Sequence, residues 1–459
     1  MPAGTAPGPR RGHSYDRLRA LDDPPPSTSA DAPPADVTGL DVRPFRALTY
    51  RQHDGDRLAR VSSPAYDLVN PAGRDRLAAA DPHNIVRLIL PGVEPLPGQE
   101  TTRAERDQRS AAVAGETLRT WLAEDVLVHD EAPALWRYEM AAPGAVPTVG
   151  WLGAVTLPAA GSVAVLPHED TFPPAVAGRA ALLAATDTDL EPIVLAHDPD
   201  PEVAALTRQT GDVPPTLEVA DPDGVVHRLW RVTDPAVLDR LTHALAGTAA
   251  VIADGHHRFA AARDHQRGRA GQGSVLALVT PMGAGGLRVR AIHRVVPDLS
   301  MSTAVESAAA GFAVRDLAQS GGAVRPVIAD WLETGADGTF LLTDGSRVAE
   351  LSEPSPAMQA AVPAEAPTAW RRLDVVLAHA ALLTGLWGRP DDPSSVLVAH
   401  DVEEALRLAA DRAGVALLLR SPSPADVAAV ARAGARMPRK STLFVPKPRT
   451  GLVLRPHVH

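Results

Sequence analysis

The stretch from Ala250 to Ala262, AVIADGHHRFAAA, constrains the fold more than any other part of the chain. Its apolar start suits a buried strand, and Asp254 with Gly255 suits a tight turn. The run HHRFAAARDHQ that follows suits a helix beginning directly after that turn. The sequence therefore predicts a strand, a bend at glycine and a helix in immediate succession.

A helix that starts at a glycine bend presents free backbone N–H groups and the positive end of its dipole, and both favour an anion. Arg258 in the first turn adds donors that match a phosphate or a carboxylate, while His256 and His257 can donate hydrogen bonds or move protons. Adjacent helical residues point about 100° apart, so we expect one histidine to line the site and the other to orient a neighbour. The alternative is that Asp254 only caps the helix and both histidines are surface or core residues. The unbroken Asp-Gly-His-His-Arg order after a buried strand favours the site.

Two further stretches carry candidate pocket residues. In VAVLPHEDTFPP, His168 and Glu169 follow an apolar run, in a loop flanked by prolines where a carboxylate is free to face a cleft. Glu169 is therefore a candidate general base, with an exposed loop acid as the alternative. His293 and Arg294 in RAIHRVV are weaker candidates, because a histidine beside an arginine in a strand also suits packing against the neighbouring strand.

Polar residues near both ends of the ordered region complete the candidate set. Tyr66 and Asp67 in SSPAYDLVNP either border the same pocket or belong to the cap of the next helix. Close to the C-terminus, MPRKSTLFVPK places Lys440 and Lys447 where they can reach an anion, unless they are only solvated charges. The Lys-Ser-Thr run is not a P-loop, because Arg439 stands where that motif needs glycine.

Elsewhere the sequence alternates helical and strand-like patterns, which predicts a mixed α/β fold. The segments expected to be helical are 71–80, 103–123 and 368–388. In the second of them Val113 is expected to face the core. The segments expected to be strands are 84–90, 275–280 and 287–296.

The chain divides by composition into three parts. Residues 1–38 mix proline, glycine, serine and charge with few apolar side chains, which predicts a disordered tail. Residues 39–300 are expected to form an α/β core that contains the phosphate site. Residues 301–459 are expected to form a C-terminal α/β region whose basic end packs back on the core.

Composition excludes several classes of function. The absence of cysteine excludes disulfides, thiolate zinc sites, iron–sulfur clusters and a cysteine nucleophile. A net charge of -10 and an aromatic content of 4% give neither a general basic field nor many stacking surfaces for nucleic acid. Since no apolar run is long enough to span a bilayer and the N-terminus lacks a signal-like apolar region, we expect a cytoplasmic protein. The expected partner is a small-molecule substrate, with no nucleic-acid module and no membrane, and the oligomeric state is left open.

Seven stretches, from SSPAYDLVNP to ARMPRKSTLFVPKPRTGLVLRP, resemble in this order the blocks of a bacterial and archaeal family of unknown function, domain number one thousand and fifteen. The resemblance covers about residue 40 to the end. The Asp-Gly-His-His-Arg run also resembles the phosphate-contacting motif of the superfamily of ParB partition proteins, sulfiredoxins and free serine kinases. This resemblance implies a ParB/sulfiredoxin-like nucleotide-site core, elaborated by additional α/β segments.

The same resemblance implies roles for individual residues. Residues 254–258 become the phosphate site for a nucleotide, ATP or ADP with Mg²⁺. Lys440, which the residues themselves place within reach of an anion, is assigned to the same site. Glu169 becomes the base that activates a hydroxyl, with His256 and His257 as further catalytic candidates. The implied function is a small-molecule phosphotransferase with free serine as a possible acceptor. The family carries a lysine and an Asp-Arg pair after His-Glu-Asp, whereas 172–180 here reads FPPAVAGRA, which leaves open whether the site is active.

Two other functions stay open on the sequence. One is a ParB-like nucleotide-binding regulatory protein without efficient catalysis, which needs a DNA-reading module that the sequence does not show. The other is a metal-dependent phosphoesterase that uses His168, Glu169, Asp254 and His256. These histidines lack the spacing of three or four residues that is usual for a metal site on a helix.

Overall fold

The computed structural model describes residues 39–93, 101–159, 161–267, 269, 271–283, 285–318, 324–390, 392 and 394–457. These residues all lie in the unit Val37–His459. The tail that we predict to be disordered, residues 1–38, lies outside the described residues.

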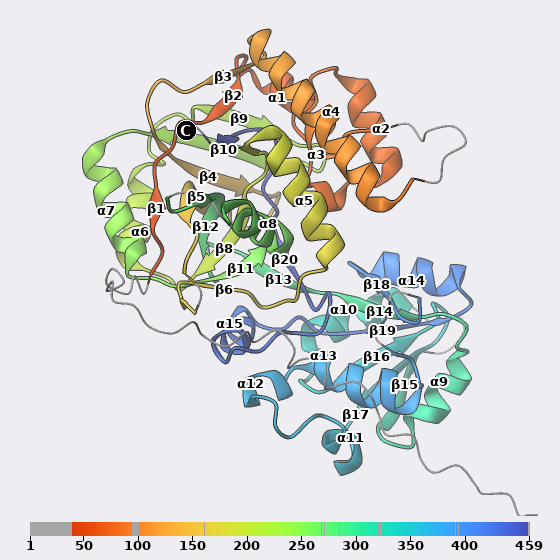
Figure 1. Cartoon of the computed structure of the whole chain (residues 1–459). Helices are drawn as coiled ribbons and strands as arrows, with labels where there is room; N and C mark the ends of the chain where they lie inside the picture. The colour runs from red at the N-terminus through yellow and green to blue at the C-terminus, as the bar shows by residue number, and fades with distance from the viewer. Residues whose placement is uncertain are drawn as a thin grey trace, which may run out of the picture. The chain divides into compact units, whose positions relative to one another are not determined.

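Most strands belong to one of two sheets (Figure 1). In the larger sheet β11 runs parallel to β6 and β12 runs parallel to β8, whereas the other neighbours pair antiparallel. Its strands in spatial order are β6 (Val165–Leu166), β11 (Ala250–Asp254), β8 (Ile193–His197), β12 (Ser274–Pro281), β5 (Thr148–Thr156), β4 (Leu135–Ala141), β10 (Val226–Val232) and β9 (Leu217–Ala220), with β1 (Val42–Arg43) beside β5.

The second sheet is antiparallel throughout the pairs that the structure describes. Its strands in spatial order are β15 (Ala313–Ala318), β17 (Val348–Ser352), β16 (Phe340–Thr343), β19 (Val415–Leu418), β14 (His293–Val296) and β18 (Leu397–Ala399). Short antiparallel pairs join distant parts of the chain: β2 (Leu48–Tyr50) with β3 (Leu127–His129), β13 (Arg288–Ala291) with β20 (Thr442–Val445), and β7 (Thr188–Asp189) with β21 (Arg455–Pro456).

Helices begin where the sequence provides caps. The side chains of Asn70, Asp234 and Ser423 accept hydrogen bonds from the first turns of their helices, and proline occupies an early position in each. Helices up to residue 266 are α1 (Gly55–Val61), a 3₁₀ turn (Tyr66–Leu68), α2 (Pro71–Ala80), α3 (Val86–Ile89), α4 (Arg103–Ala123), α5 (Pro173–Thr186), α6 (Pro201–Gln209), α7 (Pro235–Ala246) and α8 (His256–Gln266). Later helices are α9 (Met301–Ala308), α10 (Val324–Thr334), α11 (Pro356–Ala360), α12 (Thr368–Arg371), α13 (Asp374–Leu377), a π-helix (Ala378–Leu386), α14 (Val402–Asp411) and α15 (Pro424–Arg432).

The larger sheet is buried on both faces. Along β12, Val275, Ala277 and Val279 belong to a cluster with side chains of α6, α7 and α8, whereas Leu276 and Leu278 belong to a cluster with α1 and α4. This alternation follows from the two-residue period of a strand. Helices α4 and α5 run side by side, and α5 also contacts α8 (Figure 1). The predicted mixed α/β class is confirmed, and the division at residue 300 stays a prediction.

The strand predicted at residues 84–90 is wrong. These residues contain helix α3, because the side-chain oxygen of Asn84 accepts the backbone N–H of Val86 and turns the chain into a helical turn. Val86, Leu88 and Ile89 are buried in this form. Apolar period alone did not distinguish a short buried helix from a buried strand.

Three other predictions need correction in detail. The helix expected at 368–388 is broken into α12, α13 and the π-helix, because Leu373 is extended and buried between the first two. The strand expected at 287–296 divides at Ile292 into β13 and β14, which join different sheets. Helix α4 forms as expected, but Val113 is 39% exposed and does not face the core. In the part of the chain that the structure describes, no helix combines the length and the apolar character needed to cross a membrane.

Candidate functional site

The junction between β11 and α8 has the predicted form of a strand, a glycine bend and a helix. Gly255 has a φ of +92° and forms the N-cap of α8. A Cβ atom at this position would meet Cγ2 of Ile193 at 2.8 Å, so both the backbone angle and the space require glycine. Gly255 has no side chain to cap this helix, so the first backbone N–H groups of α8 receive no hydrogen bond from the N-cap residue.

A cavity of about 550 Å³ opens at this junction. Its volume lies in the range of small-molecule sites. Predicted site residues on its wall are Tyr66, Asp67, His168, Glu169, Asp254, Gly255, His256, His257 and Lys440. The structure thus brings together residues from four separate parts of the sequence. Arg258, His293 and Arg294 lie outside this wall.

Both histidines of the motif hold the loop 168–172 against the start of α8. Nε2 of His256 accepts the backbone N–H of His168 at 3.3 Å, and Nε2 of His257 accepts that of Phe172 at 3.0 Å. An imidazole that accepts through Nε2 is neutral. Burial, aided by His168, holds the pKa of His256 well below its usual range, and burial with Lys440 lowers the pKa of His257. The expectation that only one histidine faces the site is wrong, since both line it.

His168 anchors the same loop from its other side. Its backbone carbonyl accepts the N–H of Met437 at 2.8 Å, and its Nε2 lies 2.9 Å from the hydroxyl of Thr442. Its ring packs edge-on against the ring of His256 with a centroid separation of 4.7 Å. Because burial lowers the pKa of His168 to about 4, the ring is neutral at pH 7. His168 therefore positions the loop that carries Glu169.

Glu169 lies on the cavity wall in a partly buried position. Burial raises the pKa of its carboxyl group, while the Lys440 ammonium and the backbone N–H of Ser441 act in the opposite direction. A carboxylate with a raised pKa next to a ligand cavity is a suitable proton acceptor. The exposed side chain of Lys440 borders the same cavity.

A network of ion pairs surrounds Asp254 at the wall of the cavity. Lys447 Nζ donates to Oδ1 of Asp254 at 2.6 Å and also pairs with Asp67. Arg258 donates to Oδ2 of Asp254 at 2.5 Å. Although burial favours the neutral acid, Arg258 and Lys447 outweigh it and hold the pKa of Asp254 below its ordinary value. Asp254 is therefore an ionised organising group whose two oxygens are both occupied.

Arg258 does not line the cavity, although the sequence predicts it to contact the phosphate there. Besides Asp254, its guanidinium donates to the carbonyl of Pro192 at 2.8 Å and lies 5.6 Å from the ring centroid of Tyr66. Arg179 covers the same ring at 4.1 Å. Both arginines line a separate small cavity of about 40 Å³. Arg258 thus supports the site from behind Asp254 and Tyr66.

The two candidate residues on strand β14, His293 and Arg294, make hydrogen bonds within the protein and do not line the cavity. His293 is buried, and its Nδ1 accepts the backbone N–H of Leu419 at 3.2 Å. Arg294 is also buried and donates to the carbonyl of Arg439 at 3.1 Å and to Nε2 of His379 at 2.9 Å. Because Arg439 precedes Lys440, Arg294 fixes the backbone that presents this lysine to the cavity.

The distribution of lysine in the sequence is a further signal for the cavity. The chain contains 45 lysines and arginines, yet only Lys440 and Lys447 are lysines, and both line the cavity. A chain that otherwise uses arginine for every basic residue keeps a compact ammonium group only here. The chemistry of the two side chains differs, since the ammonium acts as a point charge and the guanidinium as a planar fork.

The residues that a metal-dependent phosphoesterase would use, His168, Glu169, Asp254 and His256, are not a group whose ligand atoms converge in the described part of the chain. Of the residues that the structure describes, the group whose ligand atoms converge is Asp187, His265 and His457, away from this cavity. Nε2 of His256 accepts a backbone N–H. The two carboxylate oxygens of Asp254 accept hydrogen bonds from the side chains of Arg258 and Lys447. Oxygen donors suited to Mg²⁺ are present on the loop as Glu169, Asp170 and Thr171.

The fold and the site define a mixed α/β protein whose cavity is walled by a helix N-terminus, a carboxylate loop and two lysines. Residues 42–376 match the family described as protein of unknown function, DUF1015, and the chain belongs to this family. The family predicted from the sequence is thus confirmed. No curated protein sequence matches the chain significantly.

Several solved structures are similar to the chain at low identity. A mutant of free serine kinase in complex with AMP matches at 12% identity and a TM-score of 0.30, over 61% of this chain and 83% of that chain. SbnI with a C-terminal truncation, from Staphylococcus aureus, matches at 11% identity and a TM-score of 0.35, over 67% and 87%. A conserved hypothetical protein from Pyrococcus furiosus matches at 12% identity and a TM-score of 0.30, over 63% and 90%.

Proposed function

We propose that the protein is a small-molecule phosphotransferase that moves a phosphoryl group from a nucleotide to a hydroxyl group. One observation carries this proposal. The open N-terminus of α8, the ammonium of Lys440 and the carboxyl group of Glu169, whose pKa is raised, all face one cavity. Anion-binding groups and a proton acceptor are the two components that transfer to a hydroxyl requires.

The phosphate end of the nucleotide binds at the glycine bend. Backbone N–H groups of His256 and His257 point from the helix start, and the helix dipole favours negative charge there. Lys440 faces this point from a loop that Arg294 holds by its backbone. Such fixed donors stabilise the charge of a transferring phosphoryl group without rearranging during the reaction.

Glu169 accepts the proton of the acceptor hydroxyl. As the hydroxyl oxygen forms its bond to phosphorus, the bond from phosphorus to the leaving oxygen of the nucleotide breaks and the proton passes to the carboxylate. His256 and His257 contribute by holding the loop 168–172, and they act as positioning residues. The resemblance of the motif to free serine kinases makes free serine the first acceptor to test.

Mg²⁺ fits the oxygen donors of the loop. Asp170 and Thr171 would hold it through their carboxylate and hydroxyl oxygens, the ligand type that Mg²⁺ prefers, which leaves Glu169 as the proton acceptor, and nucleotides usually bind with this ion. When bound, Mg²⁺ neutralises phosphate charge.

A regulatory nucleotide-binding protein is the second candidate. Asp254, His256, His257 and Arg258 all hold protein groups in place, so the motif organises the cavity instead of reacting. In that function nucleotide binding changes the loop 168–172, and transfer is slow or incidental. Binding alone does not separate the two candidates, and transfer to an acceptor does.

Calorimetric titration of ATP, ADP, CTP and pyrophosphate, each with Mg²⁺, tests the phosphate site. We expect one of these ligands to bind the wild type, and Lys440→Ala to weaken that binding about tenfold or more, because a hydrogen bond to a charged group is lost. Arg407→Ala is the matched control, since Arg407 is an exposed base on α14. Absence of binding to the wild type would remove both candidate functions.

The scarcity of lysine gives a second measurement on the same proteins. Amine-selective acetylation can modify only Lys440, Lys447 and the N-terminal amine, because the chain has no other lysine. Lys440 is exposed and is expected to react, whereas Lys447 is buried in its ion pairs. A bound nucleotide should slow the acetylation of Lys440 and leave that of the N-terminal amine unchanged. Equal rates with and without a ligand that binds would place that ligand elsewhere.

A further inference from the structure

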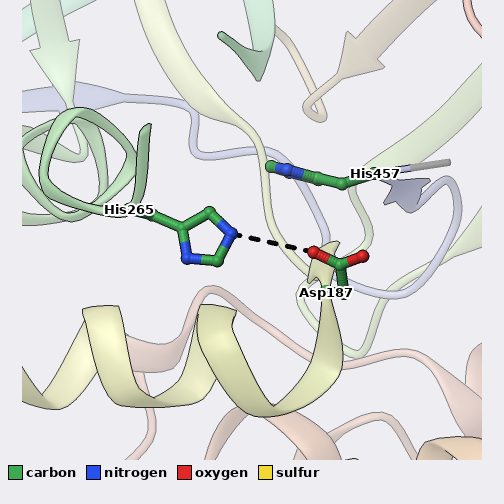
Figure 2. A group of neighbouring side chains, drawn as sticks. All are labelled: Asp187, His265 and His457. Atoms are coloured by element: carbon green, nitrogen blue, oxygen red, sulfur yellow. Dashed lines mark ion pairs between the residues drawn. The ribbon is translucent and has the colours of Figure 1, made fainter. Parts of the chain in front are cut away.

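Three polar side chains from distant parts of the sequence meet outside the cavity (Figure 2). Asp187 is the C-cap of α5, His265 lies in the last turn of α8, and His457 follows β21. Their ligand atoms, one from each residue, lie within 4.8 Å of one another. Figure 2 shows His265 and His457 on two sides of the Asp187 carboxylate.

Backbone pairing fixes two of the three residues. Strand β21 pairs with β7 so that Arg455 lies opposite Asp189 and Pro456 opposite Thr188. The next backbone hydrogen bond runs from the N–H of His457 to the carbonyl of Asp187 at 2.8 Å. Asp187 itself has a φ of +46°, a left-handed conformation that aspartate tolerates better than most residues. The backbone of Asp187 and His457 is therefore fixed before any ligand arrives.

His265 supplies an observation that the protein groups leave unexplained. Its side chain is 7% exposed, and its Nε2 has no hydrogen-bond partner among the described residues. The nearest carboxylate oxygen, Oδ1 of Asp187, lies 3.7 Å away, as the dashed line in Figure 2 marks. Burial removes the hydration energy of a ring nitrogen, and without a hydrogen-bond partner nothing offsets that cost. A ligand bound to the nitrogen would offset it.

The positive groups nearby do not satisfy this nitrogen. Arg269 lies 3.7 Å from the same oxygen of Asp187, which is the distance of a weak ion pair, and it is 42% exposed. Arg455 is directed at the buried Asp189, at 2.7 Å, and Nε2 of His457 lies 3.3 Å from Arg455 and 3.2 Å from Oδ2 of Asp189. Both arginines are thus directed at other groups, and Nε2 of His265 faces the Asp187 carboxylate from beyond hydrogen-bond distance.

We propose that Asp187, His265 and His457 bind a divalent transition-metal ion, with Zn²⁺ as the ion that the ligand set fits well. Two imidazoles and a carboxylate are typical of such ions, whereas Mg²⁺ and Ca²⁺ prefer oxygen alone. Zinc ligands lie about 2.0–2.2 Å from the ion, so the three atoms need to close by about 1 Å. Asp187 is 42% exposed and gives the ion a path of entry.

The position of this group gives the ion a structural role. It joins the last turn of α8 to the end of α5 and to the C-terminal segment after β21. The opposite end of α8 carries His256 and His257, and α5 begins directly after the loop 168–172. The ion therefore fastens the two helices that frame the cavity, at the ends remote from it. This inference does not depend on the phosphotransferase proposal.

Titration of Zn²⁺ alone into chelator-treated full-length protein tests the site. We expect one tight equivalent in the wild type and a loss of at least about tenfold in affinity for His265→Ala and for His457→Ala, since loss of an outer-shell partner alone costs that much. His243→Ala is the matched control, an exposed histidine in the last turn of α7, and should bind as the wild type does. Zn²⁺ should also raise the Tm of the wild type and of this control by a few degrees, but not that of His265→Ala.

A His256→Gln variant separates this site from the histidines of the cavity. If it binds Zn²⁺ as the wild type does, the ion is not held by His168 and His256. The proposal is overturned if the wild type binds no Zn²⁺ tightly, if His265→Ala keeps wild-type affinity, or if binding disappears in His256→Gln while His265→Ala retains it.

Discussion

A Glu169→Gln variant is expected to retain its affinity for the nucleotide and to lose phosphoryl transfer by a factor of about 10² to 10⁴, the usual contribution of a general base. The amide keeps the size and polarity of the glutamate side chain, so the loop 168–172 remains bound to His256 and His257. It cannot accept the proton of the acceptor hydroxyl. Single-turnover transfer from ATP to free serine, measured beside calorimetric binding, separates the two effects.

The matched control for this variant is Glu306→Gln, an exposed glutamate on α9. It should bind and transfer as the wild type does. Transfer by Glu169→Gln at the wild-type rate would show that Glu169 is not the base. If the wild type binds nucleotide but transfers to no acceptor, the regulatory candidate is preferred.

The pH dependence of transfer follows from the direction of the pKa shift. Burial raises the pKa of Glu169 above its ordinary value of 4.5, and only the ionised form can accept a proton. The value of kcat/KM should therefore fall as the pH decreases through this raised pKa, with a midpoint above 4.5. The acid limb should be absent from the residual activity of Glu169→Gln. A wild-type profile that is flat through this range would contradict the assignment.

Stability gives an independent check on the same variant. Because the pKa of Glu169 is raised in the folded state, the folded protein binds this proton more tightly than the unfolded chain does. Above the unfolded pKa the ionised group therefore lowers stability. At pH 7 Glu169→Gln should unfold at the same denaturant concentration as the wild type or at a higher one, so a loss of transfer cannot be attributed to misfolding.

Local signals in the sequence were sufficient for the junction of β11 and α8. An apolar run, an Asp-Gly pair and a helical pattern fix the strand, the bend and the helix start through chemistry that lies within a few residues. Capped helices such as α2 and α15 were predictable for the same reason. Residues 84–90 were not, since the side chain of Asn84 and the burial of α3 decided between two structures that the same apolar pattern allows.

The site was predictable in its members but not in their roles. Lys447 pairs with Asp67 across 380 residues of sequence, and Arg258 turns to the carbonyl of Pro192. Such partners depend on how distant segments pack, and a single sequence carries no signal of that packing. The group of Asp187, His265 and His457 escaped prediction for the same reason, because its residues share neither a motif nor a helical spacing.

Replacement of Gly255 by alanine is expected to have the largest effect on stability and to weaken nucleotide binding at the cavity. The φ of +92° strains any residue with a Cβ, and that atom would lie 2.8 Å from Cγ2 of Ile193 and 3.1 Å from Nε of Arg258. Left-handed strain and overpacking each cost about 1–3 kcal/mol, so we expect a loss of about 2–6 kcal/mol in the free energy of unfolding. Denaturant titration measures this loss. A displacement of about 1 Å at the helix start should weaken nucleotide binding about 100-fold.

Gly144→Ala separates the strain of the backbone from the clash. Gly144 also has a positive φ, +68°, but no atom of the described residues lies within 4 Å of the place that a Cβ would occupy there. This variant should therefore lose only about 1–2 kcal/mol, the cost of the backbone strain alone, and bind nucleotide normally. A Gly255→Ala, Ile193→Ala double variant should lose less stability than the sum of its single variants, because removing Cγ2 of Ile193 relieves the clash. If Gly255→Ala matches Gly144→Ala in stability and binds nucleotide as the wild type does, the cavity does not depend on the close approach of Gly255 to Ile193, and the phosphate site must be sought on another part of its wall.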